Sequence, residues 1–423
     1  MQKINIKNYF SFFIAFTVFY AIFYLYFKRE VGNDSSISEW LINYQGGFTR
    51  RGLGGEITTS IANFFSIPLR HSIFFIQSIL HISYLFLIFT YIKNLKLNIF
   101  QIFALFTPIF LLYPVAELEA LGRKEMLLFL FFIIALFFCQ KKYPTKIINS
   151  YVFIFFPVLC LIWEQVILFA PFIFVVLIIK NNLKTFKKVF INLFIIFIPS
   201  SLVIIIIFLF PLSDEGHKVM CDFLQNDFGE RCYMSANLLI KNTVYFDTLH
   251  IHNGAYFFPH YFRYIMIFLI GFMPLHILIS QNDFVKKNNF ITKNFKLDIL
   301  FFTLYSPAII LFIFGYDWGR WMHILYSFSI LLYFYMIKSS IITNNFYIKG
   351  TVWEKIFRKK KYLIILFFVF AFCWNPKTVM KGDIATNTLY KIIYNSSKKF
   401  FSFDGFRIFQ DNPIIKFHKN YIE

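Results

Sequence analysis

The chain has 423 residues, of which 58% are hydrophobic and 64 are phenylalanine, and its formal net charge is +20 at pH 7. Its mean hydropathy of +0.62 leaves too little polar surface to cover a water-soluble core. Composition therefore excludes a soluble globular domain and indicates a membrane protein. The first apolar stretch follows Lys3 and Lys7 and lacks a small-residue cleavage pattern, which predicts a retained helix instead of a leader peptide.

Eleven apolar segments are candidate membrane spans. They run at about 9–27, 72–92, 98–115, 125–139, 151–163, 165–179, 189–211, 261–280, 298–315, 321–337 and 362–374. We interpret 151–179 as two short helices that turn back at Trp163, Glu164 and Gln165, because one span would place lysine-rich loops on opposite sides. The pattern predicts an all-α polytopic fold with about 11 transmembrane helices, a cytoplasmic N-terminus and a periplasmic C-terminus.

The loops assigned to the inner side are rich in lysine, and their only acidic residues are Asp283, Asp298 and Glu354. The positive-inside rule therefore accounts for almost all of the net charge. A basic excess of this origin indicates topology and contact with membrane lipid, and it removes the reason to expect a nucleic-acid partner. We expect a multi-pass protein of the bacterial inner (plasma) membrane, with a membrane domain over residues 1–374 and a short periplasmic tail over residues 375–423.

The outer loop 28–71 contains helix signals. Asp34 or Ser35 can cap a first short helix that ends at the glycine pair 46–47, and a second, amphipathic helix is predicted from about Gly54 to Phe64. Two helices on the membrane surface are the expected result.

The outer loop 212–260 contains Cys221 and Cys232, eleven residues apart. If this loop faces an oxidising space, a disulfide is expected, and two free thiols are the alternative. His250, His252 and His260 are too loosely spaced to predict a metal site, and no metal ligands are assigned. His323, further along the chain, is interpreted as a helix-packing residue.

Five outer motifs place ionisable side chains at the membrane boundary, where charges are costly unless they are paired or hydrated. These motifs are GNDSSISEW, GGFTRRGLGGE, ELEALGRKEM, IWEQV and GYDWGRW. Asp317 and Arg320 are three residues apart and are expected to pair on one helical face, either as a functional group or as a structural ion pair. Glu164 requires a cation or a proton, and Arg123 or Arg320 is its expected partner.

Arginines dominate the candidate anion-binding residues. Arg50 and Arg51 combine two cations with backbone amides of the flanking glycines, a pattern that suits an anion, although contact with lipid headgroups is the alternative. Arg123 and Arg320 are further candidates, because a guanidinium binds phosphate oxygens in pairs. Lys124 is interpreted as a snorkelling residue with no special role.

The arrangement over residues 1–340 resembles the GT-C superfamily of polytopic glycosyltransferases, in which a first helix precedes a large outer loop with surface helices and an acidic residue. O-antigen polymerases and ligases are equally similar. The resemblance implies an active site at the outer leaflet, a polyprenyl-phosphate-linked sugar as substrate, and a loop carboxylate as general base. It places Asp34 at the base position, with Glu39 and Glu56 as substitutes. It places four basic residues at the carrier phosphate, namely Arg50, Arg51, Arg123 and Arg320.

The chain departs from that family in having no acidic pair at the start of the loop, no DxD motif and no sizeable C-terminal soluble domain. No cofactor is predicted, and a divalent metal stays open. The preferred hypothesis is a membrane glycosyltransferase or polysaccharide polymerase, with Asp34, Glu56, Glu164 and Asp317 as candidate catalytic residues. The alternatives are a transporter or flippase of a lipid-linked sugar or other anion, which mid-segment prolines keep open, and a non-catalytic membrane subunit.

Overall fold

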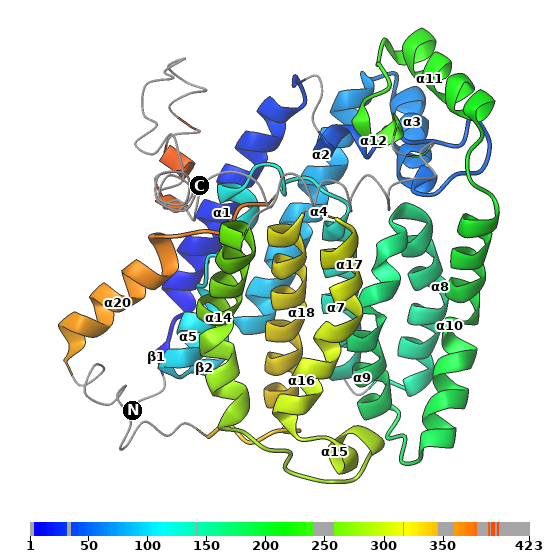
Figure 1. Cartoon of the computed structure of the whole chain (residues 1–423). Helices are drawn as coiled ribbons and strands as arrows, with labels where there is room; N and C mark the ends of the chain where they lie inside the picture. Colours follow the sequence, from blue (N-terminus) through cyan, green and yellow to red (C-terminus); the bar gives the residue numbers. More distant parts are fainter. Residues whose placement is uncertain are drawn as a thin grey trace.

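The computed structural model describes residues 4–31, 35–140, 143–237, 239, 258–315, 317–345, 359–378, 388–389, 391–393 and 396. Nearly all regular structure in this part of the chain is helical, as predicted (Figure 1). The sheet found there has two short antiparallel strands, β1 (Ile4–Asn5) and β2 (Lys96–Leu97). This pairing holds the start of α1 beside the segment that follows α4.

Five helices in the described part are long and apolar enough to cross a membrane. They are α1 (Lys7–Lys28), α4 (Leu69–Ile92), α8 (Thr145–Ile162), α10 (Phe186–Leu209) and α14 (Phe258–Ser280). Further apolar helices are shorter, among them α7 (Glu125–Gln140) and α20 (Lys360–Phe372). These lengths agree with a membrane protein but do not support the predicted count of about 11 spans.

Prolines alter two of the predicted spans. The predicted span 98–115 consists of α5 (Ile99–Leu105) and the single turn α6 (Tyr113–Ala116), with Pro108 in the non-helical segment between them. The predicted span 298–315 consists of α16 (Leu297–Tyr305), η2 (Ser306–Ala308) and α17 (Ile309–Phe314), with Pro307 in η2. Proline removes a backbone donor and disfavours helical geometry in the preceding residue. The first segment therefore does not continue as one helix, whereas the second remains a continuous helical stretch, Leu297–Ile313, that tightens to a 3-10 turn at Pro307.

The segment 151–179 turns where the sequence predicts. Helix α8 ends at Ile162, Trp163 adopts an extended backbone (φ −157°, ψ 100°), and the chain continues as η1 (Glu164–Phe169) and α9 (Ala170–Lys180). Two helical pieces with a break at Trp163 are therefore confirmed. Glu164 is the first residue after the break.

Helix α18 (Trp318–Lys338) lies at the centre of the helical assembly (Figure 1). Every residue from Gly319 to Met336 is buried, including several polar ones. By contrast, α10 exposes large apolar side chains such as Phe190, Phe194 and Phe208. This inversion is expected where lipid is the solvent, because apolar side chains can face outward and polar groups must be satisfied internally.

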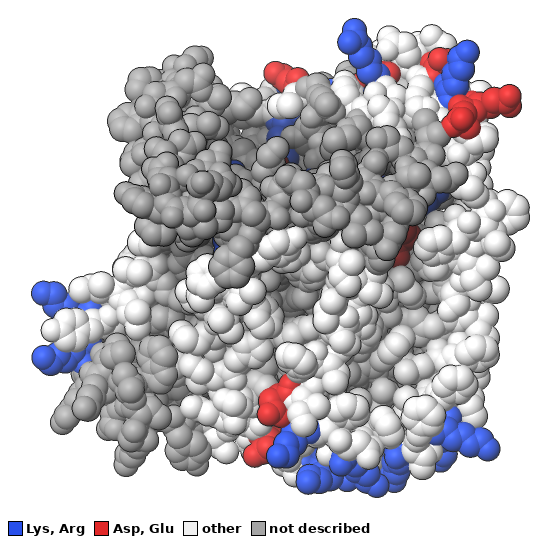
Figure 2. All heavy atoms as spheres, viewed as in Figure 1, with Lys and Arg blue, Asp and Glu red and all other residues white. Residues whose placement is uncertain are grey.

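The two ends of the assembly differ in charge (Figure 2). Basic side chains predominate at the lower end of the view, where α15 (Phe290–Asn294) lies, with some acidic ones among them. The upper end around α11 (Asp214–Phe228) shows both signs without such a basic excess. A largely uncharged surface separates the two ends. The upper end also holds α2 (Ser35–Ser38), α3 (Gly52–Phe65) and α12 (Met234–Asn237). The second surface helix of the first outer loop is thus present as α3, but the first is only one turn.

The predicted disulfide is present. Cys221 in α11 is bonded to Cys232 in the segment that leads to α12, with a Cα–Cα distance of 5.3 Å that is ordinary for such a bond. Among the other cysteines, Cys139 and Cys160 are buried and Cys373 is exposed.

This cysteine arrangement predicts a simple labelling pattern. A thiol-specific maleimide added to the folded, non-reduced protein should modify Cys373 alone, and prior reduction should add Cys221 and Cys232. Intact-protein mass spectrometry with and without reductant measures the difference. The double variant Cys221→Ser, Cys232→Ser is the matched control and should show no reductant-dependent gain. Full labelling of Cys221 and Cys232 before reduction would contradict the bond.

A short segment after α20, residues 374–378, closes over the N-terminal end of α18. Gly319 donates its backbone N–H to the Thr378 carbonyl at 3.1 Å, and Tyr264 donates its hydroxyl to the Lys377 carbonyl at 2.8 Å. A Cβ atom added to Gly319 would lie 1.8 Å from the Lys377 oxygen. Glycine is therefore required here for close backbone approach.

Gly319→Ala should lower stability even though alanine favours helices by about 1 kcal/mol over glycine. The added methyl group must push the 374–378 segment off α18, and overpacking of this kind costs about 1–3 kcal/mol. The measurement is the thermal midpoint in detergent. Ser327→Ala on the same helix is the control, because the buried Ser327 hydroxyl makes no close hydrogen bond among the described residues and should be replaceable at little cost. Equal midpoints for Gly319→Ala and wild type would contradict the close contact.

Candidate functional site

The N-terminal end of α18 carries the first part of an ion-pair cluster at the upper end of the assembly. Arg320 donates from Nη1 to Asp317 Oδ2 at 2.7 Å, so the pair predicted from their spacing is confirmed. Arg320 also donates from Nε to Glu125 Oε1, and its Nη2 lies 3.7 Å from Glu39 Oε1. Its guanidinium carbon lies 5.7 Å from the Trp163 ring centroid. One guanidinium therefore links α18 to α7, to the loop after α1 and to the break after α8.

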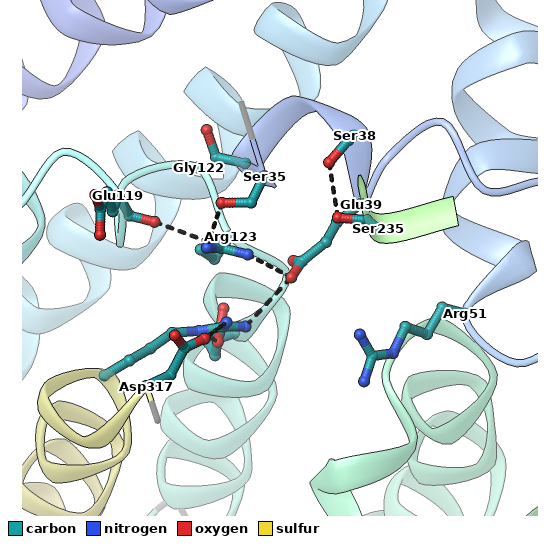
Figure 3. A network of polar contacts seen from close by, with 12 residues as sticks. Ser35, Ser38, Glu39, Arg51, Glu119, Gly122, Arg123, Ser235 and Asp317 are labelled. Carbon is teal, nitrogen blue, oxygen red and sulfur yellow. Dashed lines mark hydrogen bonds and ion pairs between the residues drawn. The ribbon is translucent and has the colours of Figure 1, made fainter. Parts of the chain in front are cut away.

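The segment before α7 supplies the second part of the cluster (Figure 3). Arg123 donates to Glu39 and Ser35 on one side and to the Glu119 carbonyl at 2.8 Å on the other. Two side chains hold the preceding turn in place: Trp40 Nε1 and Gln77 Nε2 each donate to the Gly122 carbonyl at 2.8 Å. Gly122 has φ +78°, a conformation that favours glycine.

Arg51 and Glu164 form the third part of the cluster. Arg51 donates from Nε to Glu164 Oε2 at 2.9 Å and from Nη2 to Glu164 Oε1 at 2.6 Å, which is a two-point contact. Lys124 Nζ donates to the Arg51 carbonyl at 2.9 Å and so joins this pair to the α7 segment. Figure 3 shows Arg51 extending from the α3 region toward the space that Glu39 and Arg123 occupy.

Burial and charge set the pKa values in the cluster. Burial would raise the pKa of Glu39, but Arg123, Arg320, Arg51 and Lys124 together lower it to about 2. Burial likewise opposes the ionisation of Glu164, and the adjacent Arg51 overcomes it and lowers the pKa of Glu164 to about 2. Burial lowers the pKa of Lys124 to about 7, against the opposing effect of Glu39. At neutral pH the two carboxylates are therefore ionised, and the amine of Lys124 is poised between its two forms.

The structure brings residues of all five outer motifs together, but not in all of the expected pairs. Arg51, Arg123, Glu164, Asp317 and Arg320 belong to one cluster. The expected partner of Glu164 was wrong: Arg51 binds it, not Arg123 or Arg320, because the start of α3 lies over the break after α8.

The remaining candidates lie around the cluster or apart from it. Arg50 is near enough to Glu164 to help lower its pKa. Glu56 accepts hydrogen bonds from Tyr44 N at 3.2 Å and Gln45 Nε2 at 3.4 Å, and so braces its own loop. Asp34, His250 and His252 lie outside the described residues, and nothing is described of the His260 side chain.

Sequence reasoning underestimated Glu39, Glu125 and Lys124. Glu39 is the centre of the network, although the sequence suggested it only as a substitute base. Lys124 was expected to snorkel but is 1% exposed. The missed signal is the run Arg123, Lys124, Glu125, in which three consecutive charges open an apolar helix and cannot all point to water.

The C-terminal segment adds a second acidic contact next to the cluster. Glu117 accepts a hydrogen bond from Asn375 Nδ2 at 2.9 Å and forms an ion pair with Lys391. Glu117 and Asn375 are both buried. These contacts tie the segment after α20 to the turn that precedes Arg123.

One group of potential metal ligands occurs among the described residues. His217, Cys221 and Cys232 place ligand atoms within 4.8 Å of one another. The two sulfurs form the disulfide, however, and metal ligation requires thiolates. This group therefore cannot bind a metal while the disulfide is intact.

Comparison of the chain with known protein families, with curated proteins and with solved structures finds no match.

Replacing Glu39 by glutamine should destabilise the protein strongly. The change removes the carboxylate that pairs with Arg123, while Arg320 keeps Asp317 and Glu125. An uncompensated buried charge costs about 3–5 kcal/mol in unfolding free energy. Glu56→Gln is the control and should change little, since Glu56 is partly exposed and its two hydrogen bonds are long. Denaturant or thermal unfolding in detergent gives the comparison.

The lowered pKa of Glu39 should make the unfolding free energy depend on pH. Because folding lowers the pKa of Glu39 from 4.5 to about 2, its contribution is complete above pH 4.5 and is lost as the pH falls toward 2. This pKa shift of Glu39 contributes about 3 kcal/mol to the unfolding free energy. Wild type should lose this increment over that pH window, and Glu39→Gln should not. Parallel pH profiles for the two proteins would contradict the assignment.

Proposed function

We propose that this protein is a membrane glycosyltransferase or polysaccharide polymerase that acts on a polyprenyl-phosphate-linked sugar at the outer face of a bacterial inner membrane. The upper end in Figure 1 is taken as the outer face, in agreement with the basic residues at the opposite end. The ion cluster is the proposed site for the phosphate of the lipid carrier.

One observation carries this proposal: eight ionisable side chains from distant parts of the chain converge at one end of an apolar helical assembly. The basic ones are Arg51, Arg123, Lys124 and Arg320, and the acidic ones are Glu39, Glu125, Glu164 and Asp317. Removing ions from water costs several kcal/mol each, and apolar packing could replace such pairs without loss of stability. Retaining so many is better explained by recognition of a charged substrate.

The residues divide into proposed roles by their geometry. Arg51 holds Glu164 through two N–H groups, whereas Arg123 and Arg320 bind each of their carboxylates through a single N–H group. Guanidinium N–H groups also fit phosphate oxygens, so an entering phosphate would exchange with a carboxylate. Glu39 and Glu164 are weak bases because their pKa values are about 2. Asp317 has a side chain that is 24% exposed, more than its partners, and is therefore the described carboxylate best placed to meet an acceptor hydroxyl. Asp34 remains a proposed base.

The proposal is tested by the lipid-linked intermediates of the cell. Deleting the protein should make an undecaprenyl-linked sugar accumulate and change the surface glycan, both measured by mass spectrometry. Wild type should restore the glycan, whereas Asp317→Asn and Arg51→Gln should not. Arg70→Gln is the matched control. It removes the ion pair between Arg70 and Glu230, and neither residue belongs to the cluster. An unchanged glycan in well-expressed Asp317→Asn and Arg51→Gln cells would overturn the proposal.

Lys124 predicts the pH dependence of transfer. Its ammonium form adds a positive charge to the cluster proposed to bind the carrier phosphate, and this charge is lost above its pKa of about 7, so the rate should fall as the pH increases through 7. Lys124→Met should lower the rate and flatten this fall. Initial rates from purified protein between pH 6 and 8.5 provide the measurement, with melting curves confirming that the variant is folded. A wild-type profile in Lys124→Met would exclude Lys124 as the source of the pH dependence.

A second candidate function is transport of the lipid-linked sugar or another anion. The break at Trp163 and the 3-10 turn at Pro307 favour it, because interrupted helices often form the substrate sites of transporters. Purified protein in sealed vesicles separates the two functions. A covalent glycosidic product supports the enzyme, whereas movement of the labelled carrier across the bilayer without a product supports the transporter.

A further inference from the structure

Two buried histidines lie below the ion cluster. His81 is near the middle of α4 and is 2% exposed, and His323 follows Arg320 by one turn of α18 and is 5% exposed. His323 Nδ1 lies 2.6 Å from the Ile109 carbonyl, so it must be the donor of that hydrogen bond. In a neutral ring, Nε2 is then an acceptor. The rings of Tyr113 and Phe129, at 4.8 and 5.1 Å between centroids, fix the orientation of His323.

Several polar atoms around these histidines make no close hydrogen bond among the described residues. They include Nε2 of His323 and Oε2 of Glu125 in the cluster above. They also include the ring nitrogens of His81, which lies next to the Gln77 backbone, and the hydroxyl of Tyr84, which lies next to Ser327. A buried polar atom left unpaired costs about 1–3 kcal/mol. Native structures rarely leave such groups dry, and ordered water usually satisfies them.

Two small cavities lie at these atoms. His81, Tyr84 and Thr17 line the first, and Arg123, Glu125 and Arg320 line the second. His323, Met126 and Pro114 line both cavities. Each offers about 10 Å³ to the centre of a water molecule, which is roughly the space one water needs.

We propose that each cavity binds an ordered water molecule, and that the two waters extend the ion cluster into a hydrated polar path that reaches His81 in the middle of α4. The water in the first cavity has His81, Tyr84 and His323 as partners, and the water in the second has Glu125, Arg123 and Arg320. This inference concerns the interior of the helical assembly and does not depend on the proposed enzyme activity.

The polar atoms in its wall separate the first cavity from an ordinary packing defect, although most of its lining is apolar. Cavities that stay empty are lined by apolar groups, whereas a bound water needs two to four polar partners. The first cavity supplies these partners from two helices, α4 and α18. The ionisable groups that face the path are His81 and Tyr84 from α4, His323 and Arg320 from α18, and Arg123 and Glu125 from the start of α7. Ionisable groups within a membrane protein interior are expected to be hydrated or functional.

Hydroxyl-radical footprinting by X-ray radiolysis tests the proposal on the purified full-length protein, without any substrate. Radicals formed from bound water oxidise the side chains next to it. Met126 lines both cavities and Met322 lines neither, although their exposures are nearly equal at 5% and 6%. Met126 should be oxidised several-fold faster than Met322. Equal rates would mean dry cavities and would overturn the proposal, while leaving the proposed function untouched.

Two variants test the polar lining itself. His81→Leu and Tyr84→Phe each remove polar partners from the first cavity, so both should slow the oxidation of Met126 and leave that of Met322 unchanged. Tyr84→Phe removes only a hydroxyl that lies next to Ser327 without a close hydrogen bond, so it should fold even if His81→Leu does not. An unchanged Met126 rate in folded Tyr84→Phe would show that Tyr84 holds no water and would contradict the path as proposed.

Discussion

The structure depends on the neutralisation of buried charge where apolar helices meet the upper end of the assembly. Arg320 shows the constraint most clearly. Its guanidinium is buried at the start of the central helix and is surrounded by Asp317, Glu125 and Glu39, which belong to three separate parts of the chain. Since an unpaired guanidinium in this position is costly, these contacts determine how the loop after α1 and the start of α7 lie against α18. Arg51 and Glu164 attach α3 to the break after α8 in the same way.

The sequence predicts most strongly where a single physical rule leaves few options. Charged residues beside apolar segments are rare and must find partners, so the convergence of the motifs around Arg51, Glu164 and Arg320 follows from their positions alone. Single rules also predict the disulfide and the break at Trp163. Two cysteines in one outer loop indicate the first, and the sidedness of the lysine-rich loops indicates the second. The exact ion pairs are not predicted, because they depend on how α3 crosses the end of α8. The number of spans is also not predicted, since Pro108 divides a segment whose hydropathy looks continuous. Helix length, and not hydropathy alone, is what this proline changes.

The cluster and the histidines beneath it form two environments with different chemistry. The upper one is rich in formal charge, with carboxylates held ionised by arginines and one lysine whose pKa is near neutrality. The lower one contains neutral polar groups in an apolar setting, and His323 belongs to both through the two cavities. Such a gradation lets polar groups enter the interior of a membrane protein without isolated charge at depth. It also limits how deeply the proposed carrier phosphate can bind, because only the upper environment can compensate a negative charge.

Charge reversal of the Arg51–Glu164 pair tests the central claim most directly, since the two residues are 113 positions apart and meet only if the cluster exists. Arg51→Glu and Glu164→Arg should each lower the unfolding free energy, because each places like charges together. The double variant should recover much of the loss, with a coupling energy of about 2–3 kcal/mol in the double-mutant cycle. Additive losses, with no recovery in the double variant, would mean that the two side chains do not meet and would contradict the cluster.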